Sequence, residues 1–230
     1  MDIKKLDKKW WKKEVGYQIY PRSFYDSNND GIGDLNGITE KLDYLKNLGI
    51  TLIWVCPIFK SPMDDNGYDI SDYTAVNPLF GSMDDFEEMI QVGKEYGIEF
   101  MLDMVLNHCS TEHEWFQKAL AGDNYYQDFF FLRDEPTDWL SKFGGSAWAP
   151  FGDTGKYYLH LFDVTQADLN WHNPHVREEL FKVVHFWLDK GVKGFRFDVI
   201  NVIGKDEILE NCPENDGKPA YTDRPIVHEY

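Results

Sequence analysis

The stretch IEFMLDMVL, at residues 98–106, is a short apolar run that begins directly after Gly97. Three further runs have the same character: VGYQIYPRSF at residues 15–24, ITLIWVCPIF at 50–59 and VKGFRFDVI at 192–200. Between them lie longer segments, some with apolar residues at every third or fourth position. Strands that alternate with helices predict an α/β fold built from βα units around a parallel sheet.

Three segments carry the helical pattern. The first covers residues 35–48, and the third covers residues 175–190. The second begins at Ser82 and Asp85, which form an S-x-x-D helix start, and it ends at Gly97. The sequence therefore predicts four strands, each but the first preceded by a helix.

Residues 109–172 separate the third strand from the third helix, and they are too many for a simple connection. They are rich in aromatic residues, Gly, Asp and Asn, so we expect a small inserted subdomain with the aromatic run at 125–131 in its core. The predicted domains are a first barrel part at 1–108, the inserted subdomain, and a barrel continuation at 173–230. No fifth strand is predicted, so we expect the four βα units to form the amino-terminal half of a barrel.

Composition narrows the class of protein. The chain has 230 residues, of which 43% are hydrophobic, and this is enough apolar material for a buried core. Forty acidic against 23 basic residues give a net charge of −17, which disfavours nucleic acid as a partner. Three scattered cysteines and the absence of a targeting or membrane-spanning segment predict a cytoplasmic protein without a membrane partner.

The segment DSNNDGIGD, at residues 26–34, places oxygen-bearing side chains at alternate positions around a glycine. Such spacing suits a hard cation, so we expect one structural calcium or magnesium ion and no organic cofactor. The loop differs from an EF-hand because its twelfth position is Gly37. The alternative is a turn without metal. The expected ligands are the side chains of Asp26, Asn28, Asp30 and Asp34 and the backbone oxygen of Ile32.

Charged residues gather at the ends of the third and fourth predicted strands. Asp103 and His108 belong to the third strand end, and Arg196 and Asp198 to the fourth. Residues two apart on a strand share a face, so Arg196 can keep Asp198 ionised, as a nucleophile requires. The alternative is a structural ion pair that only ties strands together.

These motifs resemble a known family. DMVLNH at residues 103–108, QADLNW at 166–171 and GFRFDVINV at 194–202 are similar, in order and spacing, to conserved regions of the α-amylase family, glycoside hydrolase family thirteen. The opening at residues 16–38 resembles the oligo-1,6-glucosidase branch. Residues 141–148, together with 166–171 and 216–230, resemble members that cleave trehalose 6-phosphate. The resemblance covers nearly the whole chain.

The resemblance implies a retaining α-glucosidase on a TIM (β/α)8 barrel, with the family's B domain inserted after the third strand. It implies that Asp198 is the nucleophile and that Arg196 orients it and takes part in substrate binding. Four further residues are implied to bind the non-reducing glucose of the substrate: Tyr68, Asp69, Asp103 and His108. A carboxylate suits the oxocarbenium-like centre of glycoside hydrolysis. Asp69 is expected not to be buried without a partner.

The general acid of the family follows a fifth strand, so we expect this chain alone to be inactive. The implied substrates are trehalose 6-phosphate, cleaved to glucose and glucose 6-phosphate, or isomaltose-type oligosaccharides. Val199 fits both and argues against starch-type linkages. Two other classes are a non-catalytic sugar-binding or scaffold relative and an ion-binding domain unrelated to sugars. Three lysines in candidate rim segments are expected to be solvated surface and not phosphate ligands: Lys156, Lys205 and Lys218.

Overall fold

A computed structural model describes residues 10–211. The described chain forms two compact units. The first unit comprises residues 10–58, 75–104 and 186–196, and the second comprises 59–74, 105–185 and 197–211. The predicted domain boundaries remain a prediction.

The four predicted strands form one sheet in the order β1-β2-β5-β11. β1 pairs with β2 and β2 with β5 in parallel, so Ile53 lies opposite both Tyr17 and Phe100. Three of these strands are shorter than the apolar runs that predicted them, and β5 nearly fills its run. The strands are β1 (Gly16–Ile19), β2 (Leu52–Val55), β5 (Glu99–Val105) and β11 (Gly194–Asp198).

Proline explains where the first run was predicted too long. Pro21 has no N–H to donate to a neighbouring strand, and it instead begins the short helix α1 (Pro21–Phe24). The second run stops at Val55, before Pro57, and its end forms β3 (Phe59–Lys60), which pairs with β4 (Asp72–Val76).

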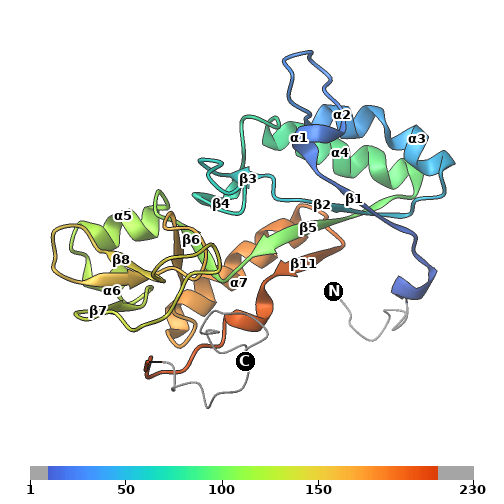
Figure 1. Ribbon diagram of the computed structural model, residues 1–230. Helices are drawn as coiled ribbons and strands as arrows, with labels where there is room; N and C mark the ends of the chain where they lie inside the picture. The colour runs from blue at the N-terminus through green and yellow to red at the C-terminus, as the bar shows by residue number, and fades with distance from the viewer. Residues whose placement is uncertain (1–9, 212–230) are drawn as a thin grey trace, which may run out of the picture. The chain divides into compact units, whose positions relative to one another are not determined.

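The first predicted helix is two helices, α2 (Leu35–Glu40) and α3 (Leu42–Asn47), so the single-helix prediction was wrong. The hydroxyl of Thr39 bonds back to the Leu35 carbonyl at 3.0 Å, a contact that bends helices. The second, α4 (Met83–Tyr96), has the predicted start and a left-handed Gly97 at its end. Figure 1 shows α2, α3 and α4 packed together beside the strands.

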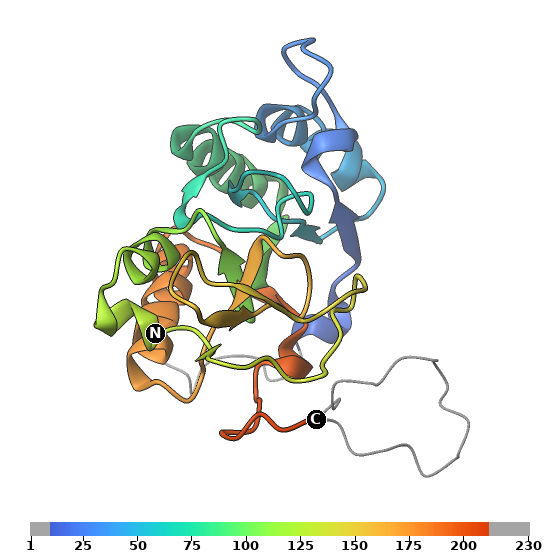
Figure 2. The ribbon, with the colours of Figure 1, turned by 60° about the vertical axis from the view of Figure 1, so that its left-hand side comes forward.

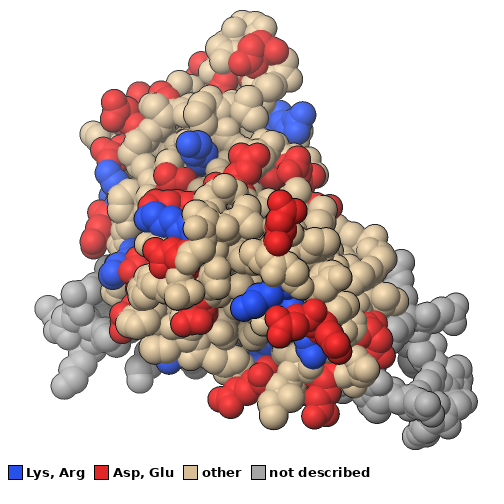
Figure 3. Space-filling view, turned by 90° about the vertical axis from the view of Figure 1, so that its left-hand side faces the viewer, with Lys and Arg blue, Asp and Glu red and all other residues tan. Residues whose placement is uncertain are grey.

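The third predicted helix is α7 (Pro174–Asp189). Its Trp187 is fully buried in the first unit and meets the ring of Phe86 edge-on, with ring centroids 5.0 Å apart. No helix within residues 10–211 is long and apolar enough to cross a membrane. The face drawn in Figure 3 carries scattered acidic side chains with separate basic groups between them.

The second unit holds more regular structure than the sequence predicted. In Figures 1 and 2, helices α5 and α6 lie beside the strands that follow them in the chain. The strands β7, β9 and β8 form an antiparallel sheet in that order. The elements are β6 (His108–Ser110), α5 (Glu114–Leu120), α6 (Asn124–Gln127), β7 (Leu132–Arg133), β8 (Trp148–Pro150), β9 (Tyr157–Leu159), β10 (Gln166–Asp168) and the 3-10 helix η3 (Ile200–Val202); η2 (Trp10–Lys13) belongs to the first unit.

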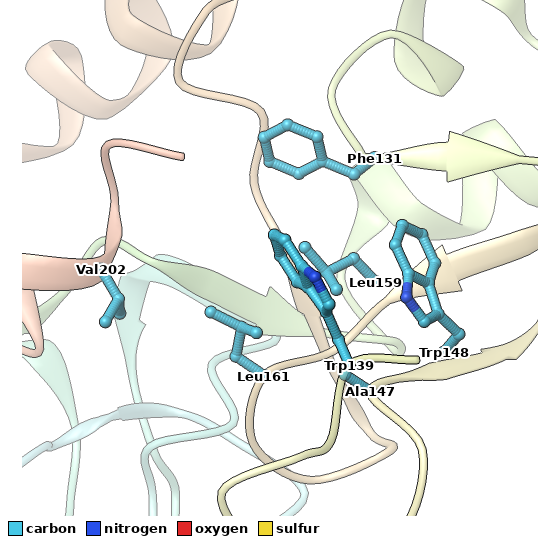
Figure 4. Close-up of a cluster of buried hydrophobic side chains, with 7 residues drawn as sticks. All are labelled: Phe131, Trp139, Ala147, Trp148, Leu159, Leu161 and Val202. Carbon is cyan, nitrogen blue, oxygen red and sulfur yellow. The ribbon is translucent and has the colours of Figure 1, made fainter. Parts of the chain in front are cut away.

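An aromatic cluster forms one core of the second unit (Figure 4). Val202, from the turn after β11, lies in this cluster with Leu161. The prediction that residues 125–131 form core holds only for the end of that run, because Phe129 to Phe131 are buried while Tyr125 on α6 is 44% exposed. The cluster consists of Phe131, Trp139, Ala147, Trp148, Leu159, Leu161 and Val202.

Candidate active site

In the first unit, Asp103 is held at the centre of the sheet. The Arg196 guanidinium donates to its two carboxylate oxygens at 3.0 and 3.2 Å, and the Trp54 indole N–H donates at 3.1 Å. The guanidinium also lies over the Trp54 ring, 5.0 Å from its centroid. Asp103 is fully buried, so these donors replace the water that the carboxylate loses on folding. The geometry ties β5 to its neighbours β2 and β11.

Asp198 is the last residue of β11 and is only partly buried. By strand alternation its side chain shares a face of β11 with Arg196. Its negative charge acts on two groups of the second unit. It adds to the raised pKa of Asp65, and it partly offsets the lowering of the His108 pKa by burial. A partly exposed carboxylate at a strand end can meet a ligand, and its role as nucleophile remains a proposal.

Asp69 is fully buried, and it has partners, as expected. Its carboxylate accepts hydrogen bonds from the Ser61 hydroxyl at 2.8 Å and from the backbone N–H groups of Asp64 and Asp65 at 2.9 and 3.1 Å. These bonds close the loop between β3 and β4 around the carboxylate. The neighbouring Tyr68 is half-buried, and its carbonyl lies 3.2 Å from His108 Nε2.

His108 is buried where two of the quoted motifs meet. β6 and β10 pair antiparallel, and this register sets His108 opposite Asp168. Nδ1 of His108 lies 3.1 Å from the Asn107 amide nitrogen, and Nε2 lies 3.1 Å from that of Gln166. Burial lowers the pKa of His108, against the smaller raising effects of Asp168 and Asp198, so the ring is neutral at neutral pH.

Sequence reasoning missed several polar residues around His108. Asp168 and Gln166 belong to the QADLNW motif, which was recognised without a role for either residue. Asp65 is a third: burial raises its pKa, and its carboxylate accepts from the Gln166 amide at 2.8 Å. Three neighbouring acids, Asp69, Asp163 and Asp198, raise that pKa further.

The prediction that Lys205 is solvated surface was wrong. Lys205 is 6% exposed, and its ammonium lies 2.8 Å from Asp168 Oδ1. Its position after the strand β11 and the turn η3 brings it back against the second unit's core, a long-range contact that composition does not signal. Lys156 is exposed, as expected, and Lys218 lies outside the described residues.

In the loop of residues 26–34, the oxygens that were predicted to bind a cation accept backbone hydrogen bonds. Asp26 accepts from the N–H groups of Asn28, Asn29, Asp30 and Gly31, of which the Gly31 bond at 2.8 Å does most to lower the Asp26 pKa. Within residues 10–211, no three side chains of the types His, Cys, Asp and Glu gather to hold a metal.

Asp34 is also committed locally, because it caps α2 by accepting from the Gly37 N–H at 2.6 Å. The oxygen-rich donor set suits a hard cation, yet an ion would have to replace backbone donors around Asp26. The cation and its five ligands therefore stay a prediction beside the metal-free turn.

Comparison with known proteins places this geometry in a family. The model of the α-amylase catalytic domain matches residues 18–230. The chain belongs to the α-amylase family. The expected fold class, part of a TIM barrel with a subdomain inserted after the third strand, is thereby confirmed.

Members of the α-amylase family that are similar to this chain are named as hydrolases or glucosidases. Trehalose-6-phosphate hydrolase of Bacillus subtilis (strain 168) is 52% identical over 96% of the chain, and oligo-1,6-glucosidase of Parageobacillus thermoglucosidasius is 50% identical over 98%. The crystal structure of Bacillus licheniformis trehalose-6-phosphate hydrolase superposes with a TM-score of 0.87 and 52% identity over 94% of the chain. The chain spans 41%, 42% and 40% of these three proteins, respectively.

Proposed function

We propose that the protein carrying this chain is a retaining glycoside hydrolase that cleaves α-glucosidic bonds. One observation carries the proposal: Asp198 ends β11 two residues after an ion-paired Arg196, in a chain of the α-amylase family. The similar hydrolases and glucosidases support the bond type. A carboxylate at the carboxyl end of a barrel strand is in the usual position for catalysis in this fold.

In the proposed reaction, the Asp198 carboxylate attacks the anomeric carbon and forms a covalent glucosyl intermediate, which water then hydrolyses. Arg196, held by Asp103, keeps its positive charge beside the nucleophile. The leaving oxygen takes a proton from a second carboxyl group. We propose that this acid is a Glu after a fifth barrel strand, outside residues 10–211, so that these residues alone hydrolyse no unactivated glucoside.

Trehalose 6-phosphate is the first proposed substrate, and isomaltose-type oligosaccharides are the second. The isomaltose-type substrates are retained because the chain is nearly as similar to the oligo-1,6-glucosidase as to the trehalose-6-phosphate hydrolase. The identity is two percentage points lower and extends over slightly more of the chain. The ratio of kcat/KM for trehalose 6-phosphate to that for isomaltose, measured on the natural protein, decides between them.

The nucleophile is tested with Asp198→Asn, assayed on an aryl α-glucoside whose leaving group needs little acid help. Turnover should fall by about three or more orders of magnitude, because the covalent route is removed. Asp206→Asn, in the exposed loop after η3, is the matched control. Retention of more than about a tenth of the rate by Asp198→Asn would contradict the assignment.

A further inference from the structure

Lys205 has an unusual environment for a lysine. Its ammonium donates to Asp168 Oδ1 at 2.8 Å, to Asn107 Oδ1 at 2.8 Å and to the Val202 carbonyl at 2.9 Å. These three acceptors use all three hydrogens of an ammonium group. Val202 is itself anchored in the cluster of Figure 4, and the Phe131 ring lies 5.5 Å from the ammonium. Lys205 is therefore a fixed point charge inside the second unit.

This charge decides how the Asn107 amide is oriented. Oδ1 faces the Lys205 ammonium, and Nδ2 donates to Asp168 Oδ1 at 3.0 Å. Turning the amide over would place an NH2 group against the ammonium and a carbonyl against the carboxylate, and both contacts would be repulsive. Only one orientation of Asn107 is compatible with the buried ion pair.

The fixed amide in turn constrains His108. The second hydrogen of Asn107 Nδ2 points to His108 Nδ1, 3.1 Å away, so Nδ1 must accept. A neutral imidazole with an accepting Nδ1 carries its proton on Nε2. The Tyr68 carbonyl, 3.2 Å from Nε2, requires the same proton.

One contact opposes this assignment. The Gln166 amide nitrogen, 3.1 Å from His108 Nε2, would prefer an accepting Nε2. Gln166 is itself fixed, because it donates to Asp65 and its Oε1 accepts from the Asp163 N–H at 2.8 Å. Two partners of the ring thus require the proton on Nε2 and one requires it on Nδ1, and the ring cannot satisfy all three.

We propose that Lys205 is a positioning residue that, through the amide of Asn107, holds His108 in the Nε2–H tautomer. This inference rests on the proposed function for its purpose: a neutral His108 whose Nε2–H holds the carbonyl of Tyr68, a residue that is proposed to contact the sugar. The tautomer itself can be observed without any substrate. A failure of this inference is therefore distinguishable from a failure of the proposed function.

The test is ¹⁵N NMR of histidine-labelled natural protein, with the His108 signals assigned by His108→Asn. We expect Nε2 to resonate as a protonated ring nitrogen and Nδ1 as an unprotonated one. Lys205→Met alone leaves Asp168 as a buried, uncompensated charge and can fail to fold. The double variant Lys205→Met with Asp168→Asn removes both charges, so that the Asn107 amide can turn over. The Gln166 amide can then donate to an accepting His108 Nε2. His108 should then populate the Nδ1–H tautomer.

Gln166→Leu is the matched control, because it removes the opposing contact and should leave the tautomer unchanged. With the double variant, kcat/KM on an aryl α-glucoside should fall about tenfold, mainly through KM, because Tyr68 would lose the Nε2–H bond that holds its backbone in place. Lys205→Arg, which keeps the charge, should recover part of the loss. An Nδ1–H tautomer in the unaltered protein, or an unchanged Nε2–H tautomer in the double variant, would overturn the proposal.

Discussion

The pair of Arg196 and Asp103 offers a direct energetic test of the sheet's polar centre. Arg196→Met removes the guanidinium from a fully buried carboxylate, which keeps the hydrogen bond from the Trp54 indole at 3.1 Å. Breaking a buried pair costs about 3–5 kcal/mol. Because the Arg196 side chain is 36% exposed, water can replace part of the lost contact, and we expect the free energy of unfolding to fall by about 2–3 kcal/mol.

Asp103→Asn should cost less, about 1–2 kcal/mol, because water can reach the guanidinium that remains. The double variant has no uncompensated charge, so its cost should fall short of the sum by about 1.5–3 kcal/mol. Urea unfolding of the four proteins, evaluated with a common slope, measures this coupling energy.

A second ion pair in the same unit provides the control for this cycle. Lys193 and Glu99 stand 3.5 Å apart, with side chains 37% and 40% exposed. Exposed pairs contribute about 0–1 kcal/mol, so the Lys193→Met and Glu99→Gln cycle should give a coupling energy below about 1 kcal/mol. A coupling energy for Arg196 and Asp103 no larger than this control would refute the reasoning.

Three further predictions concern other parts of the chain. Calorimetric titration of the metal-stripped natural protein with calcium should show one site in the loop of residues 26–34, lost in Asp26→Asn, and no heat at millimolar calcium would exclude the ion. Burial lowers the pKa of His113 from 6.5 to about 4, so the stability that neutral His113 contributes is complete above pH 6.5 and is lost as the pH falls toward 4. His113→Asn keeps the helix cap and should lose less free energy of unfolding in urea over that pH interval. An identical loss of stability in both proteins would contradict the lowered pKa of His113. Gly93→Ala should lower the free energy of unfolding by about 1–3 kcal/mol despite a better helix propensity, because its Cβ would meet the Phe100 ring at 2.4 Å. In the control Gly204→Ala the new Cβ enters open space, and stability should be unchanged. Equal unfolding midpoints for the two variants would show that α4 shifts freely.

The strands of the sheet and the start and end of α4 could be predicted because their signals are local. The capping box at Ser82 and Asp85 and the left-handed Gly97 are read directly from neighbouring residues. The same locality explains the errors. Pro21 ends a strand by beginning a helix, and the break at Lys41 lies inside an otherwise regular apolar pattern, two residues after the Thr39 hydroxyl contact.

The candidate site was only partly predictable, because half of it depends on contacts between distant residues. Asp69 was singled out from its immediate neighbours, and its burial with partners agrees. Lys205 was misjudged because its acceptor Asp168 lies far back in the chain, and no periodicity links the two. The pairing of β6 with β10, which places Asp168 opposite His108, is likewise a tertiary fact.

The central claim is that Asp198 attacks the sugar and forms a covalent intermediate. The most direct measurement is mass spectrometry of the natural protein after reaction with a 5-fluoro-α-glucosyl fluoride, which slows hydrolysis of such an intermediate. We expect one fluoroglucosyl group per protein, carried by the peptide that contains Asp198 and absent in Asp198→Asn. A label on any other carboxylate, or hydrolysis with inversion of the anomeric centre and no label, would contradict the account.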